Sequence, residues 1–307
     1  MSLSIYWGWF KMKSGMISIV GRPNVGKSTL LNEILNKKVA ITSDKAGTTR
    51  NLILGVYNDD DSQIVFVDTP GIHKPQHKLG KVLNDKAYLM TDNIDLILFM
   101  VDISRGFGKG DRFVLDRIKD TNTKIILLLN KIDAISKEEL IKRIDEIKDV
   151  YDFSEIIPIS AIKSINVNDL IKTIKKYLPN EGKFYEDDYV TNQPMSLIIT
   201  ERVREKVLRL THDEIPHTVT CVIDSLEEDD KLISAGVTVV VDRENLKKIL
   251  IGKNGSMLKE IGTKARIDLE EYFNKKVFLS LYVKVIKNWR DRDSLINELG
   301  LKDDLSE

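Results

Sequence analysis

The sequence of 307 residues contains one cysteine, Cys221, and no excess of charge of either sign. A single thiol excludes an intramolecular disulfide and any zinc or iron–sulfur site built from several cysteines. Lys and Arg together number 47, as do Asp and Glu, so nucleic acid could be bound only by a local basic patch. No stretch approaches the ~18 consecutive apolar residues of a transmembrane helix. With no secretory signal either, we expect a protein of the reducing cytoplasm.

The first 13 residues contain three closely spaced aromatic side chains, Tyr6, Trp7 and Trp9. Their apolar run is too short to span a bilayer and lacks a small-residue cleavage site. Two interpretations remain open, a poorly ordered leader or a segment that touches a membrane surface. We favour the leader and assign residues 1–13 to it.

The length and the apolar fraction of 42% are typical of two globular domains. Between residues 14 and 180, short apolar runs alternate with helical patterns, as expected for βαβ units around a mostly parallel sheet with helices on both faces. The strands predicted for this first domain lie at residues 17–20, 52–56, 64–67, 96–101, 125–129 and 156–159. Helical spacing is clearest at residues 138–149 and 167–178.

The pattern changes after residue 180. Residues 181–196, rich in Pro, Gly, Asn and acidic side chains, predict a linker. A second domain at 197–290 then follows the order helix, strand, strand, helix, helix, strand, and residues 291–307 form a tail. Its predicted elements are a helix at 195–210, strands at 219–224 and 236–242 split by an acidic turn at 225–230, helices at 244–251 and 256–273, and a strand at 276–285.

The strongest motif is GRPNVGKS at residues 21–28, which follows one predicted strand and opens a helix. Gly21 and Gly26 let the chain turn so that successive backbone N–H groups cradle phosphate oxygens at a helix N-terminus. Lys27 adds a point charge toward the β- and γ-phosphates, and the Ser28 hydroxyl binds Mg²⁺. A chance strand–turn–helix is the weaker interpretation, because both flanking elements are the expected ones.

Three further motifs follow predicted strands, at the sheet edge where open α/β sheets bind ligands. In DTPG, Asp68 can hold the Mg²⁺ shell and the Gly71 N–H can meet the γ-phosphate. In NKID, Asp133 can accept hydrogen bonds from N1–H and N2–H₂ of guanine, a donor pair that adenine lacks. The Lys131 stem can lie along the base, while residues 160–161 can present an N–H to guanine O6. Together the motifs predict a guanine-nucleotide site.

The combination GRPNVGKST, AGTTR, DTPGIHKP, NKID and ISA, followed by GKNG, resembles the Era family of bacterial GTPases over nearly the whole chain after residue 13. The resemblance implies a P-loop GTPase domain, a first switch at residues 42–51, and Thr49 (or, less favoured, Thr48) on Mg²⁺. The implied catalytic residues are Lys27, Thr49 and Gly71, and the implied metal ligands are Ser28, Thr49 and Asp68. The implied GTP-binding residues are Gly21, Arg22, Pro23, Asn24, Val25, Gly26, Lys27, Ser28, Thr29, Asp68, Thr69, Pro70, Gly71, Ile72, Asn130, Lys131, Ile132, Asp133, Ser160 and Ala161.

Ile72 follows DTPG where Ras-type GTPases carry the glutamine that orients the attacking water. An aliphatic side chain cannot orient water, so we expect slow intrinsic hydrolysis of GTP. Asn24 occupies the position that helps to bind K⁺ in related GTPases, and we hypothesise activation by K⁺. For His73 and His77 we favour exposed loop positions over a catalytic or metal-binding role.

GKNG matches the G-x-x-G of KH domains, in which two glycines allow a sharp turn to approach a nucleic-acid backbone. Its position between two helices predicts an α+β type II KH fold, with Gly252, Lys253, Asn254 and Gly255 binding RNA. Residues 181–307 have a net charge of −5, whereas residues 246–277 hold 8 basic and 4 acidic side chains. This excess of positive charge could bind RNA phosphates. An ordinary helix surface of mixed charge would show the same sequence pattern, so that interpretation stays open. The basic residues of the helix at 195–210 can equally pair with its own glutamates.

The leading hypothesis is a GTPase switch whose nucleotide state controls RNA binding by the second domain. The resemblance implies a monomeric cytoplasmic protein with Mg²⁺ as cofactor and the 3′ end of small-subunit (16S) rRNA as target. It further implies a role in rRNA processing and biogenesis of the 30S subunit, with peripheral association with the inner membrane. The alternatives are an RNA-binding assembly factor in which GTP is structural, and a membrane-associated GTPase.

Overall fold

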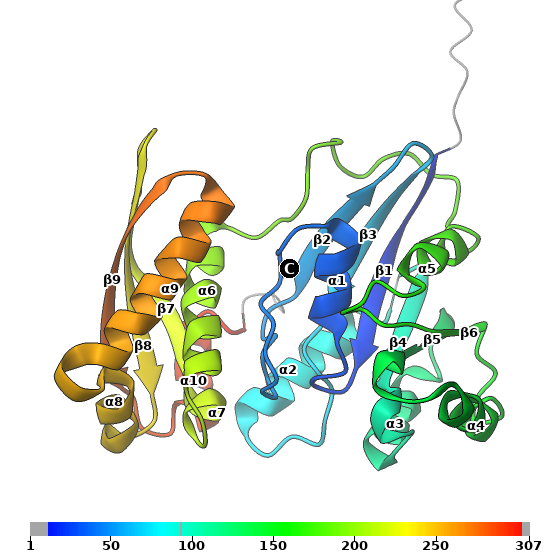
Figure 1. Cartoon of the computed structure of the whole chain (residues 1–307), viewed down its shortest axis with the longest axis horizontal. Helices are drawn as coiled ribbons and strands as arrows, with labels where there is room; N and C mark the ends of the chain where they lie inside the picture. Colours follow the sequence, from blue (N-terminus) through cyan, green and yellow to red (C-terminus); the bar gives the residue numbers. More distant parts are fainter. Residues whose placement is uncertain (1–11, 93, 303–307) are drawn as a thin grey trace, which may run out of the picture.

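The computed structural model describes residues 12–92 and 94–302, which form two domains side by side (Figure 1). The N-terminal domain is built on a six-stranded sheet of order β2-β3-β1-β4-β5-β6. The β2–β3 pair is antiparallel and the other neighbouring pairs are parallel. Its strands are β1 (Lys13–Gly21), β2 (Ile53–Asn58), β3 (Ser62–Asp68), β4 (Leu96–Asp102), β5 (Lys124–Asn130) and β6 (Glu155–Pro158). The predicted mostly parallel sheet is confirmed.

Helices cover both faces of this sheet, which explains why its central strands are apolar throughout. Alternate residues of β4 face opposite ways, so that Leu98 enters one buried cluster and Phe99 the other. The first cluster contains Leu30 and Leu170, and the second contains Val114 and Ile147. The helices of this domain are α1 (Lys27–Leu35), α2 (Lys78–Leu89), α3 (Lys109–Ile118), α4 (Lys137–Ile147) and α5 (Val167–Ile174).

The C-terminal domain has a three-stranded sheet of order β7-β8-β9, with β7–β8 antiparallel and β8–β9 parallel. One face of the sheet packs against three helices, through buried residues such as Val203, Leu250 and Ala265. The predicted order of elements is therefore confirmed, with one added short helix, α7. The elements are α6 (Met195–Leu210), α7 (Ile215–Thr218), β7 (Thr220–Glu228), β8 (Leu232–Val241), α8 (Glu244–Ile251), η3 (Lys253–Gly255), α9 (Ser256–Phe273) and β9 (Lys276–Val285).

Several predicted boundaries are wrong. Strand β1 includes Lys13, which we had placed in the leader, because residues 13–19 pair in register with β3. The predicted acidic turn at 225–230 is mostly strand, since β7 continues to Glu228 opposite β8. The helix predicted at 167–178 ends as α-helix at Ile174.

Residues 181–194 contain no helix or strand and run along the edge of the first sheet. The Val190 carbonyl accepts a hydrogen bond from the Val56 amide of β2, and the Gln63 side chain accepts from the amides of Phe184 and Tyr185. The chain then enters α6 at Met195, two residues before the predicted domain boundary. Tyr6, Trp7 and Trp9 lie outside the described residues. Within the described residues, no helix is long and apolar enough to cross a membrane.

The end of the predicted second domain and the predicted tail (291–307) contain short helices that the sequence did not predict. Residues Trp289–Asp291 form the short helix η4, and α10 (Asp293–Glu298) follows. The Trp289 side chain is fully buried, and its indole N–H donates to the Thr218 carbonyl at 2.9 Å. With Ile296 and Leu301 it joins a cluster that includes residues 79, 82 and 83 of α2. Residues 289–301 therefore pack against both domains.

Candidate functional site

The loop between β1 and α1 has a backbone path that only glycine allows at two positions. Gly26, the N-cap of α1, has φ 108°, and a Cβ there would lie 2.3 Å from the side-chain nitrogen Nδ2 of Asn130. A Cβ on Gly21 would lie 2.4 Å from the Met100 carbonyl oxygen. The loop is thus pressed against the ends of β4 and β5, with its amides at the start of α1.

Lys27 is the first residue of α1, and its buried side chain turns back into this loop. Its ammonium group donates to the carbonyls of Gly21 at 3.2 Å and Arg22 at 3.0 Å. Burial lowers the pKa of Lys27 to about 8, against the opposing effect of Asp68. Phosphate oxygens entering the loop would favour the charged form and could take over its hydrogen bonds.

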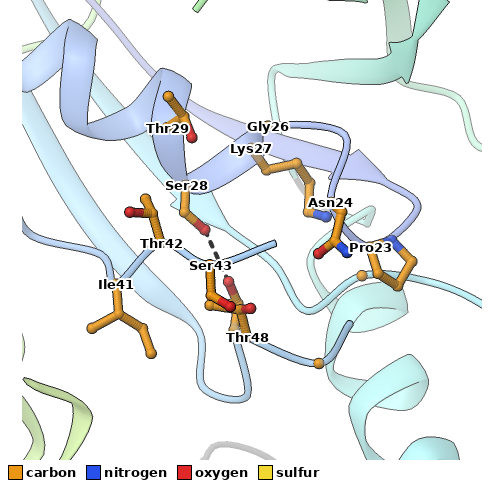
Figure 2. Close-up of a pocket in the computed structure, with 13 residues that line it drawn as sticks. Pro23, Asn24, Gly26, Lys27, Ser28, Thr29, Ile41, Thr42, Ser43 and Thr48 are labelled. Carbon is orange, nitrogen blue, oxygen red and sulfur yellow. Dashed lines mark hydrogen bonds between the residues drawn. The ribbon is translucent and has the colours of Figure 1, made fainter. Parts of the chain in front are cut away.

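Three oxygen-bearing side chains, those of Ser28, Thr49 and Asp68, converge beside the phosphate loop. Figure 2 shows the Ser28 side chain at the start of α1, next to Lys27. The Ser28 hydroxyl donates to Asp68 Oδ2 at 2.6 Å and lies 2.9 Å from the Thr49 hydroxyl, which is 3.4 Å from the same carboxylate oxygen. The second oxygen, Asp68 Oδ1, is buried without a hydrogen-bond partner. Burial raises the pKa of Asp68. An all-oxygen set with an unused buried acceptor fits Mg²⁺.

The structure distinguishes between the two threonines of the first switch. Thr48 donates its hydroxyl hydrogen to the Lys45 carbonyl at 2.6 Å, away from Asp68. Thr49 is therefore the residue at the candidate metal site. The pocket around the loop is also lined by Ile41, Thr42 and Ser43, which sequence reasoning did not assign to nucleotide binding.

The NKID segment is tied both to the phosphate loop and to the residues after β6. Asn130 donates to the Val25 carbonyl at 2.7 Å and accepts from the Ala161 amide at 3.0 Å. The Lys131 ammonium group donates to the Asn24 carbonyl at 2.8 Å. Asp133 is exposed, and one of its carboxylate oxygens accepts from the Ser160 hydroxyl at 2.5 Å. The predicted base-binding residues thus lie together, and the second carboxylate oxygen of Asp133 is available to a guanine base.

Other predicted site residues lie near the pocket without aiming a side chain into it. The Arg22 guanidinium pairs with Asp111 of α3 at 3.2 Å, and the Thr69 hydroxyl donates to the Ile19 carbonyl at 2.8 Å. Ile72 is fully buried in the core, so its side chain cannot orient a water molecule at the γ-phosphate position. Among the remaining predicted residues, Pro23, Asn24 and Thr29 line the pocket, Val25 is buried, and Pro70 and Ile132 are parts of the DTPG and NKID loops.

His73, His77 and Cys221 make local structural contacts and contribute no side chain to the nucleotide pocket. His77 caps α2, accepting at Nδ1 from the Gly80 amide at 3.0 Å, and burial lowers its pKa. The His73 ring lies 3.1 Å from the Gly71 carbonyl oxygen. Burial raises the pKa of Cys221 to about 12, which makes its thiol inert. Residues 12–92 and 94–302 contain no cluster of three His, Cys, Asp or Glu side chains that could hold a metal.

Sequence reasoning missed a direct contact between the first switch and the C-terminal domain. Arg204 of α6 is fully buried and donates to the carbonyls of Thr48 and, at 3.3 Å, Gly47. The same guanidinium pairs with Glu201 at 2.6 Å, as the sequence suggested for this helix. Arg204 therefore holds the carbonyl next to the candidate Mg²⁺ ligand Thr49.

Arg50, on the other side of Thr49, is also anchored in the C-terminal domain. Its guanidinium donates to the Val219 carbonyl at 2.8 Å and lies 5.6 Å from the centre of the Trp289 ring. Burial, together with the nearby charge of Arg204, lowers the pKa of Arg50 to about 9. The residues before and after Thr49 thus both bind the C-terminal domain.

A buried carboxylate links the start of the same switch to α6. Glu205 accepts from the Thr42 amide at 3.1 Å and from the Lys38 ammonium group at 2.7 Å. Although burial alone would raise it, the pKa of Glu205 is lowered, chiefly by Lys38. Asp268 of α9 binds the same ammonium group at 2.9 Å and also pairs with Lys206. Helices α6 and α9 therefore both contact the N-terminal domain.

The GKNG turn is a candidate nucleic-acid interface. Three residues of this turn have positive φ: Gly252 at 73°, Asn254 at 53° and Gly255 at 77°. A Cβ on Gly252 would lie 2.8 Å from the Met257 amide nitrogen. Lys253 and Asn254 are exposed, so their polar groups can meet phosphates. A groove between α9 and β9 begins at this turn and is lined by Gly255, Leu258, Lys259, Gly262, Thr263, Arg266, Leu279 and Leu281.

Comparison with known proteins places both sites within families. A family model described as 50S ribosome-binding GTPase matches residues 16–131, and a KH-domain model matches residues 214–290. Two solved structures of Era are each 42% identical, with a TM-score of 0.92 over 94% of this chain and 99% of theirs. One is an Aquifex aeolicus Era variant bound to GDP and AlF4⁻. The other is Era with MgGDPNP and nucleotides 1506–1542 of 16S ribosomal RNA.

The close approach of Gly71 to the phosphate loop generates a prediction. A Cβ on Gly71 would lie 2.6 Å from the Pro23 nitrogen, so Gly71→Ala must push the DTPG loop away from the γ-phosphate position. We expect GTP to bind at least about tenfold more weakly, the loss of roughly one charge-assisted hydrogen bond. GDP binding should be unchanged. Calorimetric titration with both nucleotides measures this.

Gly182→Ala is the matched control, because a Cβ there meets nothing within 4 Å. An equal loss of GTP and GDP affinity in Gly71→Ala would contradict the placement of Gly71 at the γ-phosphate.

Proposed function

The chain belongs to the Era family of GTPases, and on that premise we propose that it is a GTP-driven switch that binds the 3′ end of 16S rRNA. In this role it assists rRNA processing and biogenesis of the 30S subunit. The observation that carries the proposal is that one loop, residues 47–50, both contributes Thr49 to the nucleotide site and is held by the RNA-binding domain. Era itself has been solved with a GTP analogue and this part of 16S rRNA bound together.

Hydrolysis of GTP by this site is a matter of positioning and charge neutralisation. Asp133 would bind the guanine edge, the loop amides and Lys27 would hold the phosphates, and the Gly71 amide would fix the γ-phosphate. Ser28, Thr49 and Asp68 would hold Mg²⁺, which supplies charge neutralisation between the β- and γ-phosphates. No covalent intermediate is needed. Because Ile72 is buried, the attacking water must be positioned by backbone, a cation or a partner, and unassisted turnover is slow.

Asn24 is placed to take part in binding a monovalent cation. Its backbone has φ 64°, and its side-chain amide lies 2.6 Å from the Asp44 carbonyl oxygen of the first switch. We propose that Asn24 Oδ1 and the Asp44 carbonyl oxygen bind K⁺ in place of this hydrogen bond, and that the ion adds positive charge beside the phosphates, as an arginine does in other GTPases.

This predicts faster turnover of GTP in K⁺ than in Na⁺ at equal ionic strength. Asn24→Gly keeps the left-handed backbone allowed but removes the side chain, so it should abolish the preference for K⁺. Phosphate release measured in KCl and NaCl checks both statements. Equal rates for the unaltered protein would refute a role for K⁺.

The RNA is expected in the groove that begins at the GKNG turn. Lys253 and Asn254 would face phosphates, and Leu279 and Leu281 of β9 would offer apolar contacts to bases. Lys259 and Arg266 line the groove as well, although Arg266 also pairs with Glu270 at 2.8 Å. Local positive charge of this kind can bind RNA in a domain whose overall charge is negative.

Crosslinking to RNA in cells tests this site. Bound fragments should cluster at the 3′ end of 16S rRNA and be lost in the Lys253→Asp/Asn254→Asp variant. Lys142→Asp on α4 of the other domain is the control for a change of charge alone, because Lys142 is exposed there. Scattered fragments, or fragments retained in the double variant, would mean that GKNG is only a turn.

The closed first switch suggests which nucleotide state binds RNA. Thr49 already lies beside Ser28 and Asp68, as Mg²⁺–GTP would require, while Arg204 holds the neighbouring carbonyl. The two Era structures that align over 94% of this chain hold a GTP analogue and GDP with AlF4⁻. We propose that GTP stabilises this domain arrangement and thereby RNA binding.

The prediction is that RNA binds at least about fivefold more tightly with GDPNP than with GDP, a usual size of coupling between two sites. Replacing Arg204→Met together with Glu201→Gln removes both charges, so that no buried charge is left unpaired. In that variant the two RNA affinities should become similar. Fluorescence anisotropy with labelled RNA measures them.

Arg243→Ala, an exposed arginine of the same domain, should keep the coupling. Tighter RNA binding with GDP would refute the proposed direction. RNA could also leave the rate of GTP turnover unchanged and bind equally well with GDPNP and GDP. That result would favour the alternative in which GTP is structural over the GTPase switch.

A further inference from the structure

The outer face of the C-terminal sheet presents two large aromatic side chains to solvent. On β9, Phe278 is 61% exposed and Tyr282 is 63% exposed. They point away from the helices, because the alternate residues Leu279 and Leu281 pack into the core on the other face. In Figure 1 most of this sheet lies beyond α6 from the GTPase domain, and only its end at Val240 joins the Trp289 cluster that also contains residues of α2. Neither ring belongs to that cluster, so the two rings have no role in the domain contact.

The two rings leave a shallow floor between them. Four residues apart on a strand, they are separated by about 13 Å, too far to pack on each other. Between them lies Ser280, whose neighbour across the ladder is Gly236 of β8. A Cβ on Gly236 would lie 2.7 Å from the Ser225 hydroxyl, so no large side chain fits there. Each ring therefore keeps a flank open to a planar group.

Positive charge accompanies the rings along the same strand. Lys276 and Lys284 are exposed on the same face of β9, one before Phe278 and one after Tyr282. Neither lysine has an ion pair among the residues that the structure describes. Acidic side chains also border this face: Asp230 and Glu270 line a pocket together with Lys276, and Asp224 lies on β7, beyond β8. Asp224 accepts a hydrogen bond from the Thr238 hydroxyl at 2.6 Å.

We propose that this strip, defined as Lys276, Phe278, Ser280, Tyr282 and Lys284, is a second RNA contact, on which bases of single-stranded RNA stack. Aromatic rings on a sheet with lysines beside them suit any base, because every base has a π-face. Strand β9 is at the edge of its sheet, and its opposite face lines the groove at the GKNG turn. RNA leaving the groove over this edge reaches the strip directly. The inference rests on the proposed function.

The test compares two RNAs on the full-length protein with GDPNP. The long RNA corresponds to nucleotides 1506–1542 of 16S rRNA, and the short one is its minimal fragment that still requires Lys253 and Asn254. Phe278→Ala and Tyr282→Ala should each weaken the long RNA at least about fivefold, the lower end of base–aromatic stacking. The short RNA should bind as before. Tyr282→Phe should behave like the unaltered protein, since it keeps the ring.

Phe184→Ala, which removes a 46% exposed ring of the linker, is the matched control and should change neither affinity. As an independent readout, the long RNA carrying 5-iodouridine should crosslink to the peptide 276–284. Unchanged affinity for the long RNA, or crosslinks confined to the groove, would overturn the proposal. So would variants that bind both RNAs normally but fail to bind 30S subunits, which would assign the strip to a protein partner.

The two proposals fail in different ways. If the unaltered protein binds neither RNA, the proposed function itself is wrong. If both RNAs bind equally well and independently of Phe278 and Tyr282, the groove is the whole RNA site and only the second contact is wrong.

Discussion

Of the contacts between the two domains, the one beside Thr49 depends on a single buried guanidinium. Arg204 is bound at once to Glu201 of its own helix and to the backbone carbonyls of residues 47 and 48. Buried backbone carbonyls need hydrogen-bond partners, so the loop and α6 cannot separate without leaving polar groups unsatisfied or exposing them to water. Since Thr49 follows directly, whatever fixes Thr49 also favours this position of α6. The coupling must act in both directions, because the free energies of binding at linked sites are reciprocal.

A second contact joins the other side of the nucleotide site to the same domain. Helix α2, which follows the DTPG loop, contributes Leu79, Val82 and Leu83 to the cluster that buries Trp289 and Ile296. Trp289 also stacks on Arg50 of the first switch. Both segments that respond to the γ-phosphate in GTPases therefore pack against the C-terminal part of the chain. A change in either segment would alter the surface on which that domain rests.

The sequence predicted those features whose determinants are local. GRPNVGKS, NKID and GKNG each place their chemistry within eight residues, and the apolar runs of β4 and β5 predict buried parallel strands by themselves. The domain contact could not be predicted, because Arg204 is 156 residues from the Thr48 carbonyl that it binds. In the sequence α6 looks like an amphipathic helix with paired surface charges. Ile296 and Leu301 were missed because single apolar residues in a charged segment show no period.

Helices α6 and α9 provide a physical connection between the groove and the nucleotide site. One side of α9 lines the groove through Lys259 and Arg266, while its Asp268 binds Lys206 of α6 and Lys38 of the GTPase domain. A ligand that moved α9 relative to α6 would break the ion pair between Asp268 and Lys38, which lies beside the first switch. The remaining partner of that lysine, Glu205, also holds the Thr42 amide. RNA bound in the groove could thus affect the nucleotide site without contacting the nucleotide, because Lys38, Glu205 and Asp268 connect α9 to the first switch.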